Sequence, residues 1–289
     1  MPSSPDEQHG RSDGPLSPST DNERGLRSIL RDLQSAIVAY SGGVDSATLL
    51  AVAHEEIGDR VLAVTGRSPS VASGELEAAG ALAQALGVRH LVIDTREFDD
   101  PRYRANERDR CFFCKHELFS RLLAIAQELG FDHVIDGFNA DDGRAPLDHR
   151  PGHAAGAALG VRSPLAQAGL GKEEIRTIAR RLQLPVSEKP ATPCLSSRVP
   201  YGTVIQIDDL RRIDLAERYL RALGYAVVRV RHYGRAARIE VPLAQVEKLE
   251  AMRPRIERAL RAIGYLRVDI DPQGYRMGSL NARAAVSGL

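Results

Sequence analysis

Cysteine is scarce in this chain of 289 residues, which has three cysteines and no tryptophan. A low, odd number of cysteines argues against the disulfide framework of a secreted protein and fits a reducing compartment. Long apolar runs are also lacking, and the N-terminus does not have the apolar core of a signal peptide. We therefore predict a cytoplasmic protein with no membrane partner.

A dominant charge of one sign is missing too, because 39 Lys and Arg are balanced by 38 Asp and Glu. The resulting net charge of +1 provides no global field for a stable nucleic-acid partner or an anionic membrane. Basic residues are nevertheless in excess after residue 190. This excess suits an anionic small molecule, although scattered surface arginines explain most of it.

Apolar residues are sparse in residues 1–22, which are rich in Ser, Pro, Gly and charge and predict a disordered tail. Beyond the tail, short runs of branched residues are typical of buried parallel strands. They are AIVAY (36–40), VLAVT (61–65), HLVIDT (90–95) and DHVID (132–136). Helically spaced apolar residues lie between these runs, and each helical stretch ends at a glycine. The alternation predicts a doubly wound α/β fold, whose ligands bind at the C-terminal ends of the strands.

The pattern changes after about residue 195, where a smaller α+β unit is predicted. Its expected elements are a helix at 207–225, strands at 226–232 and 237–241, a helical stretch at 242–265 and a last strand at 266–271. We predict a nucleotide-binding domain over 23–194 and a separate small α+β domain over 195–289.

The sequence AYSGGVDSATLL (39–50) leads from a predicted strand into a predicted helix. Its two glycines allow a tight turn, so that backbone amides and the helix N-terminus converge on an anion. Ser41 and Ser46 add hydroxyl donors, and Asp45 is a candidate ligand for Mg²⁺. The pattern is not a Walker motif, which requires GxxxxGK[ST]. It resembles the pyrophosphate loop (PP-loop) of N-type ATP pyrophosphatases, which implies that ATP is bound by Ser41, Gly42, Gly43, Val44, Asp45 and Ser46.

DGFNADD (136–142) follows the fourth predicted strand, at the edge where a doubly wound site lies. Asp136 and Asn139 are candidates for orienting the nucleotide or its metal. Asp and Asn also cap helices and form turns, so each residue taken alone leaves both roles open.

RCFFCK (110–115) places Cys111 and Cys114 at metal-ligand spacing. A structural zinc site needs four ligands, so His116 or His153 would have to join the three cysteines. Three cysteines holding an iron–sulfur cluster leave one iron open to an exogenous ligand. A redox dithiol and two buried, unliganded cysteines remain alternatives.

The third cysteine, Cys194, lies in EKPATPCLSSRVPYGTVI (188–205), where three prolines predict an irregular path. Nearby Lys189 and Arg198 would lower the pKa of the thiol, which suits both ligation and sulfur chemistry. The polar neighbours make a buried filler role less favourable.

Arg229 and Arg231 alternate on one predicted strand, so both point to the same face and can clamp a phosphate or carboxylate. Glu240 lies on the next strand and Glu217 on the preceding helix, which makes them candidate Mg²⁺ ligands. A salt-bridged sheet face is the alternative that the pattern alone favours.

Together these motifs resemble the LarE family, ATP-dependent sulfur transferases that build the nickel-pincer nucleotide cofactor of lactate racemase. The matching segments are SGGVDS (41–46), RCFFCK (110–115), DGFNADD (136–142), KPATPCLSSR (189–198), YGT (201–203), VRVRH (228–232), ARIEV (237–241) and GYRMGSLN (274–281). The resemblance covers nearly the whole chain after residue 22, and PCLSSR is its most specific segment.

The resemblance implies that ATP adenylates the carboxylates of pyridinium-3,5-biscarboxylic acid mononucleotide, and that sulfur then displaces AMP. It implies substrate binding by Arg198, Arg229 and Arg231, a metal site near Glu217 and Glu240, and a homo-oligomer such as a hexamer. Family members with one cysteine, at the position of Cys194, sacrifice its sulfur. Members with three hold a 4Fe-4S cluster that carries an extra sulfide, which requires a sulfide donor and cluster-assembly machinery.

With Cys111, Cys114 and Cys194 all present, we predict the cluster-dependent branch and keep a sacrificial Cys194 as the alternative. A tRNA thiolation enzyme is the nearest rival, but it needs a more basic surface. A nucleotide sensor or metal-binding interaction module that retains the loop is the non-enzymatic alternative.

Overall fold

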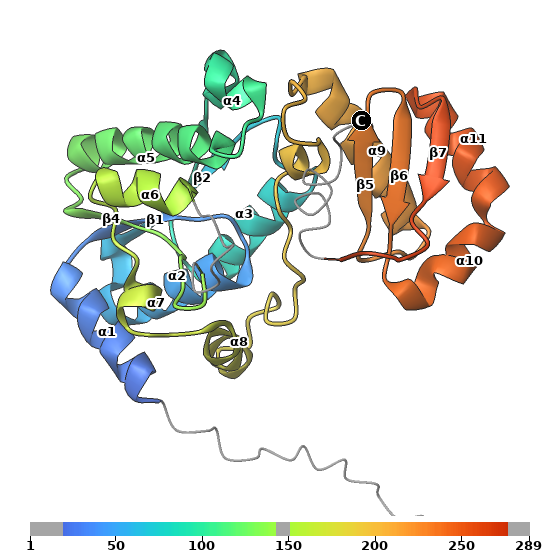
Figure 1. Ribbon diagram of the computed structural model, residues 1–289. Helices are drawn as coiled ribbons and strands as arrows, with labels where there is room; N and C mark the ends of the chain where they lie inside the picture. Colours follow the sequence, from blue (N-terminus) through green and yellow to red (C-terminus); the bar gives the residue numbers. More distant parts are fainter. Residues whose placement is uncertain (1–19, 143–150, 277–289) are drawn as a thin grey trace, which may run out of the picture.

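We describe the fold from a computed structural model, in which residues 20–142 and 151–276 are described. Its larger sheet has the strand order β3-β2-β1-β4, and all of its strands are parallel (Figure 1). The strands are β1 (Ala36–Ala39), β2 (Val61–Arg67), β3 (His90–Asp94) and β4 (His133–Ile135). All four predicted strands and the doubly wound α/β class are confirmed.

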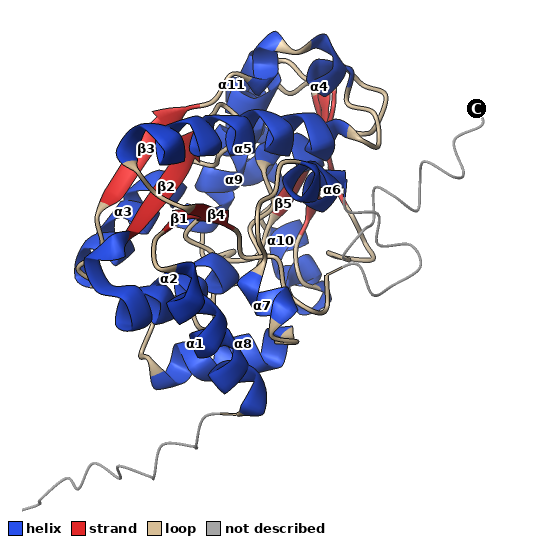
Figure 2. Cartoon of the chain, turned by 90° about the vertical axis from the view of Figure 1, so that its left-hand side faces the viewer, coloured by secondary structure: helices blue, strands red, loops and turns tan. Residues whose placement is uncertain are grey.

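Helices cover both faces of the sheet (Figure 2). Successive side chains of each strand point to opposite faces and so pack against different helices. Ile37, Leu62 and Val64 point to one face and pack with α5, whereas Val38 and Ala63 point to the other and pack with α1 and α2. The helices of this part are α1 (Asp21–Leu33), α2 (Val44–Ile57), α3 (Glu75–Ala85), α4 (Pro101–Ala105), α5 (Arg110–Leu129), α6 (Pro151–Ala158), α7 (Pro164–Gln167) and α8 (Lys172–Arg181).

The first helix begins inside the predicted tail. Thr20 caps α1 by accepting a hydrogen bond from the N–H of Glu23 at Oγ1 (3.2 Å), so Asp21 and Asn22 form its first turn. Residues 1–19, the rest of that tail, lie outside the described residues.

The smaller sheet has the order β5-β6-β7, with β5 and β6 antiparallel and β6 and β7 parallel. Its strands are β5 (Arg229–Tyr233), β6 (Ala236–Glu240) and β7 (Arg267–Ile270), and its helices are α9 (Ile207–Ala222), α10 (Val246–Ala251) and α11 (Arg253–Ile263). The stretch at 242–265, expected as one helical segment, forms two helices. Pro254 lies in the first turn of α11, where its missing N–H costs nothing, and a helix running through it would lose a hydrogen bond.

Residues 182–206 connect the two sheets and contain no α-helix or strand. The chain has short 3₁₀ turns at Gly58–Arg60, Glu97–Asp99, Leu195–Arg198 and Leu243–Gln245. Leu195 and Val199 of the connecting segment pack with Tyr103 of α4 and Leu210 of α9, which ties the segment to both parts. None of the helices in the described ranges is long and apolar enough to cross a bilayer.

Candidate functional site

The loop between β1 and α2 has the predicted form, since Ser41, Gly42 and Gly43 turn the chain directly into the N-terminus of α2. The Ser41 N–H donates to Ser46 Oγ (3.2 Å), whose hydroxyl donates to Gly43 O (3.2 Å). Gly42 has φ +69°, and a Cβ on it would lie 2.9 Å from the Cβ of Ala79. The turn therefore requires glycine and leaves a helix N-terminus facing an open site.

Asp45, the candidate magnesium ligand, is held by a lysine from a distant segment. Lys172 Nζ donates to both carboxylate oxygens of Asp45 (2.7 and 2.6 Å), and the Lys172 N–H donates to Asp141 Oδ2 (2.7 Å). Sequence reasoning missed Lys172. The sequence did contain a signal. Lys172 is the first residue of α8, where the helix dipole disfavours a cation, so its presence there suggests a specific partner.

Residues after β4 pack directly against the loop. A Cβ on Gly137 would lie 2.9 Å from Ser46 N, so this glycine permits the close approach. Asp136 Oδ1 accepts hydrogen bonds from Ser163 Oγ (2.7 Å) and Phe138 N (3.2 Å). Asn139 is buried and uses Oδ1 to accept from Asp141 N (3.0 Å), so in this structure its side chain shapes the turn.

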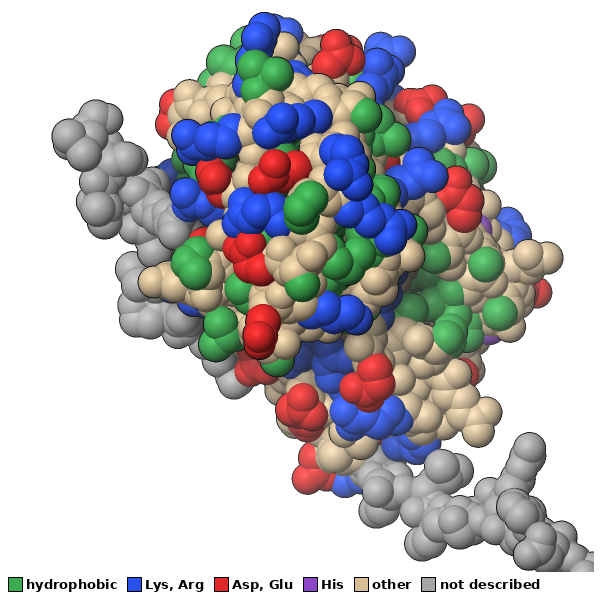
Figure 3. Space-filling view, turned by 90° about the vertical axis from the view of Figure 1, so that its right-hand side faces the viewer, with side chains coloured by type: hydrophobic (Ala, Val, Ile, Leu, Met, Phe, Trp, Pro, Cys, Tyr) green, Lys and Arg blue, Asp and Glu red, His purple; other side chains and the backbone are tan. Residues whose placement is uncertain are grey.

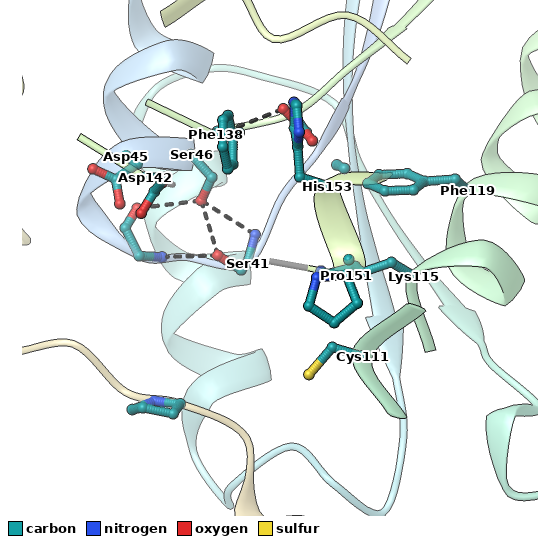
Figure 4. A pocket seen from close by; sticks show the side chains of 16 residues that line it. Ser41, Asp45, Ser46, Cys111, Lys115, Phe119, Phe138, Asp142, Pro151 and His153 are labelled. Carbon is teal, nitrogen blue, oxygen red and sulfur yellow. Dashed lines mark hydrogen bonds between the residues drawn. The ribbon is translucent and has the colours of Figure 1, made fainter. Parts of the chain in front are cut away.

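A cavity of about 480 Å³ joins the loop to the first cysteine (Figure 4). Ser41, Asp45 and Ser46 line it on one side, and Cys111 and Lys115 of α5 line it on another. Gly43, Asp136 and Pro193, the residue before Cys194, also contribute, whereas Gly42, Val44 and Asn139 are not among its lining residues.

His153 and Phe138 also face this cavity, with their rings stacked at 3.7 Å between centroids and 17° between planes. His116 stacks on Phe112 instead. Within the described residues, no group of three or more His, Cys, Asp or Glu is arranged to hold a metal ion. The zinc alternative with either histidine therefore gains no support.

The three cysteines come from two segments that the fold brings together. Cys111 and Cys114 lie in the first two turns of α5, and Cys194 is exposed just before the 3₁₀ turn at Leu195–Arg198. Burial raises the pKa of the Cys114 thiol to about 12, and the neighbouring Glu97, Cys194 and Cys111 add to the shift. Cys114 also packs against the cluster that contains Leu195, the residue after Cys194, so the two cysteine-bearing segments meet.

Lys189, expected beside Cys194, reaches the PP-loop instead. Its Nζ donates to Glu75 Oε2 (2.8 Å) and Gly42 O (3.3 Å). It therefore ties the connecting segment to the nucleotide side of the site.

The arginines and glutamates of the smaller sheet are paired with one another. Arg198 is 0 % exposed, and its Nε and Nη2 donate to the two carboxylate oxygens of Glu217 (2.8 and 3.0 Å). Arg231 donates twice to Glu240 Oε2 (2.9 and 2.7 Å). Each glutamate is thus neutralised by arginine, and the magnesium site at Glu217 and Glu240 stays a prediction.

Arg229 differs from the other two arginines in what surrounds it. Its Nη2 donates to Ala191 O (2.8 Å), and its guanidinium lies over the ring of Tyr275. Burial and the adjacent Arg198 charge lower the pKa of Arg229. The basic excess elsewhere is dispersed, because acidic side chains lie among the Lys and Arg on the face over α10 and α11 (Figure 3).

Comparison with known proteins agrees with this architecture. Residues 35–105 match a family model described as queuosine biosynthesis protein QueC. An uncharacterized protein of Synechocystis sp. is 44% identical over 258 residues, covering 89% of this chain and 95% of that protein. A pyridinium-3,5-bisthiocarboxylic acid mononucleotide synthase of Lactiplantibacillus plantarum is 36% identical over 257 residues, covering 89% of this chain and 92% of the synthase. The chain belongs to the LarE family, that of this synthase.

Membership of the LarE family confirms the resemblance seen in the motifs and makes the chain an ATP-dependent sulfur transferase with a PP-loop. A tRNA-specific 2-thiouridylase, MnmA of Acidiphilium cryptum, is more distant, at 29% identity over 215 residues and 62% of each chain. The relatives at 44% and 36% identity each match 89% of this chain, whereas the tRNA enzyme matches 62% of it.

Proposed function

We propose that this protein adenylates the two carboxylates of pyridinium-3,5-biscarboxylic acid mononucleotide and converts them to thiocarboxylates. One observation carries the proposal: a single cavity is lined both by the PP-loop and by Cys111, with Pro193 beside Cys194. A carboxylate activated at the loop would then meet sulfur without leaving the site. The name of the L. plantarum relative supports this substrate.

Activation begins with ATP on the loop. The amides at the N-terminus of α2 and the hydroxyls of Ser41 and Ser46 would bind the leaving phosphates, with Mg²⁺ at Asp45. A substrate carboxylate attacks the α-phosphorus, the bond to the β-phosphate oxygen breaks, and pyrophosphate leaves. Lys172 supplies a cation beside Asp45 that stabilises charge developing on the departing pyrophosphate.

Sulfur transfer follows at the acyl carbon, where a sulfur nucleophile displaces AMP. We propose that Cys111, Cys114 and Cys194 together hold a 4Fe-4S cluster. The donor set fits, because Cys114 packs against an apolar cluster that includes Tyr103, Leu195 and Val199, and Cys111 and Cys194 lie on the two segments that meet there. Each thiolate of a cubane binds a different iron, so the absence of a single-ion site in the described residues does not bear on this fit. When bound, such a cluster supplies an iron without a protein ligand, on which a sulfide from an external donor can be held.

A sacrificial Cys194 is the alternative route, and one experiment separates the two. The protein is reconstituted anaerobically with iron and sulfide, and its absorption spectrum, iron content and turnover number are measured. The cluster route predicts bound iron and several products per subunit. No iron, one sulfur lost per subunit and dehydroalanine at position 194 would establish the sacrificial route.

Substrate identity is tested separately by pyrophosphate release. Release with the biscarboxylate mononucleotide and none with tRNA supports the proposal. Release only with tRNA would favour thiolation, the activity named for the MnmA relative, and no release with either would favour a nucleotide-binding module.

We further propose that residues 23–194 carry out activation, that residues 195–289 bind the substrate, and that the protein forms a homo-oligomer such as a hexamer. Analytical ultracentrifugation tests the last point, since a monomer at micromolar concentration would exclude it.

A further inference from the structure

The segment that carries Cys194 is held by its main-chain carbonyls. Arg198 Nη1 donates to Pro193 O (2.7 Å), to Cys194 O (3.1 Å) and to Ser197 Oγ (2.9 Å). Nε and Nη2 of Arg198 donate to Glu217, so the guanidinium is anchored on α9 while it holds the loop. Arg198 therefore determines the path of the chain on both sides of the thiol.

Both arginines of β5 also donate to main-chain carbonyls of this segment. Arg229 holds Ala191 O, three residues before Cys194, and Arg231 Nη1 donates to Ser197 O (3.0 Å), three residues after it. Arg198 donates to the carbonyl of Cys194 itself, which lies midway along the sequence between these two positions.

Contacts on the opposite side fix the segment against the part that carries the other cysteines. The Leu195 N–H donates to Ser70 O (2.8 Å), and Arg110 Nη1 donates to Ser196 O (2.9 Å). The Tyr103 hydroxyl lies 2.8 Å from Ser196 Oγ. Arg110 immediately precedes Cys111, so the same contacts that fix the loop also fix it relative to the first turn of α5.

We propose that Arg198 is a positioning residue for Cys194: it holds the thiol within reach of Cys111 and Cys114 and does not contact the substrate. A guanidinium that has no exposed surface and donates hydrogen bonds within the protein from all three of its nitrogens is not available to a ligand in the cavity. A lysine in its place would keep the charge but lose the fork that reaches Glu217 and the carbonyls together. The proposal rests on the proposed function only in assigning sulfur chemistry to the three thiols.

Cross-linking of thiols tests this position without substrate, ATP or cluster. The full-length chain is freed of iron under reducing conditions and treated with dibromobimane, which becomes fluorescent on joining two nearby thiols. Mass spectrometry then gives the yield of links from Cys194 to Cys111 or Cys114. We expect R198K to lower this yield several-fold at a temperature well below its unfolding transition.

R221K is the matched control, because Arg221 also donates to Glu217 but, among the described residues, makes no hydrogen bond to residues 191–197. We expect it to cross-link like the unaltered protein. E217Q, which keeps the shape of the anchor and removes its charge, should give an intermediate yield. It also tests the proposal if R198K does not fold.

Kinetics separate positioning from substrate contact. Positioning predicts that R198K lowers the rate of thiocarboxylate formation by about tenfold or more, since small misplacements of a reacting group cost up to about 100-fold, with the KM for the mononucleotide unchanged. A raised KM with normal cross-linking would overturn the proposal in favour of substrate binding. Unaltered protein that releases no pyrophosphate would refute the proposed function but leave the cross-linking result interpretable.

Discussion

Lys172 and Asp45 form the ion pair that joins the start of α8 to the PP-loop. In the function proposed above, Lys172 stabilises the charge that develops on the departing pyrophosphate, and contacts of this kind contribute strongly to catalysis. We expect K172A to lower the rate of pyrophosphate release by roughly 100- to 1,000-fold.

Steady-state measurement of pyrophosphate checks this expectation, with K248A as the control. Lys248 lies on α10 near the ring of Tyr225, in the smaller-sheet part, and its loss should leave the rate unchanged. A K172A enzyme with nearly full activity would show that Lys172 serves only to hold Asp45.

An alanine at Gly42 would be destabilising for two reasons, which are a strained positive φ and a steric clash. G234A is strained only by its backbone, since Gly234 has φ +65° and open space around it, and we expect a loss of about 1–2 kcal/mol of unfolding free energy. G42A adds a clash with Ala79, which we expect to cost about 1–3 kcal/mol more. Urea denaturation measures both, and equal losses would contradict the packing argument.

Helix α9 and the 3₁₀ turn at Leu195–Arg198 are joined by the ion pair between Arg198 and Glu217. E217A leaves Arg198 buried without the carboxylate that neutralises it, so we expect it to lower the free energy of unfolding by about 3–5 kcal/mol. E257A removes exposed pairs within α11 and should cost about 0–1 kcal/mol. Denaturant titration compares the two, and a small loss in E217A would mean that water reaches Arg198.

The same pair makes stability depend on pH. Burial alone would raise the pKa of Glu217, but the hydrogen bonds and charge of Arg198 outweigh it, so the pKa in the folded protein is lowered from 4.5. A carboxyl whose pKa is depressed by folding contributes stability above its unfolded pKa and loses it as the pH falls through its folded pKa. We expect the unfolding free energy to fall with pH below about 4.5, and E217Q to flatten this dependence. An unchanged slope in E217Q would assign the acid sensitivity to other carboxyls.

At the scale of the whole molecule, the arginine contacts with residues 191–197 link the two sheets into one unfolding unit. We expect the intact protein to unfold in one thermal transition. A non-hydrolysable ATP analogue at 100 times its Kd should stabilise it by about 2.7 kcal/mol.

R198M removes the main link and should separate the unfolding into two transitions. Only the transition that belongs to the nucleotide-binding part should then respond to the analogue. Differential scanning calorimetry distinguishes these cases, and a single transition in R198M that still moves with the analogue would show that the remaining contacts suffice for coupling.

Local sequence determined the layers of the larger sheet and its loop. Branched runs near residues 36, 61, 90 and 132 have to be buried, and a strand followed by SGGVDS can only turn tightly into a helix because Gly42 accepts a positive φ. Two boundaries were not predicted. Helix α1 starts within the predicted tail because Thr20 caps it, and the helical stretch at 242–265 breaks at Pro254. Both depend on single residues, which the spacing of apolar residues does not reveal.

Tertiary structure alone decided which partners the charged residues take. Lys172 is separated from Asp45 by 127 residues, and Lys189 from Gly42 by 147, so nothing in either neighbourhood predicts the contact. The sequence predicts an anion-binding site from three arginines, Arg198, Arg229 and Arg231. In the folded chain these arginines donate instead to carboxylates and to the carbonyls around Cys194. The sequence by itself determined which chemical groups are present and which fold carries them, because strand and loop signals are local. Their pairing arises only when burial removes water and forces each guanidinium to find acceptors within reach.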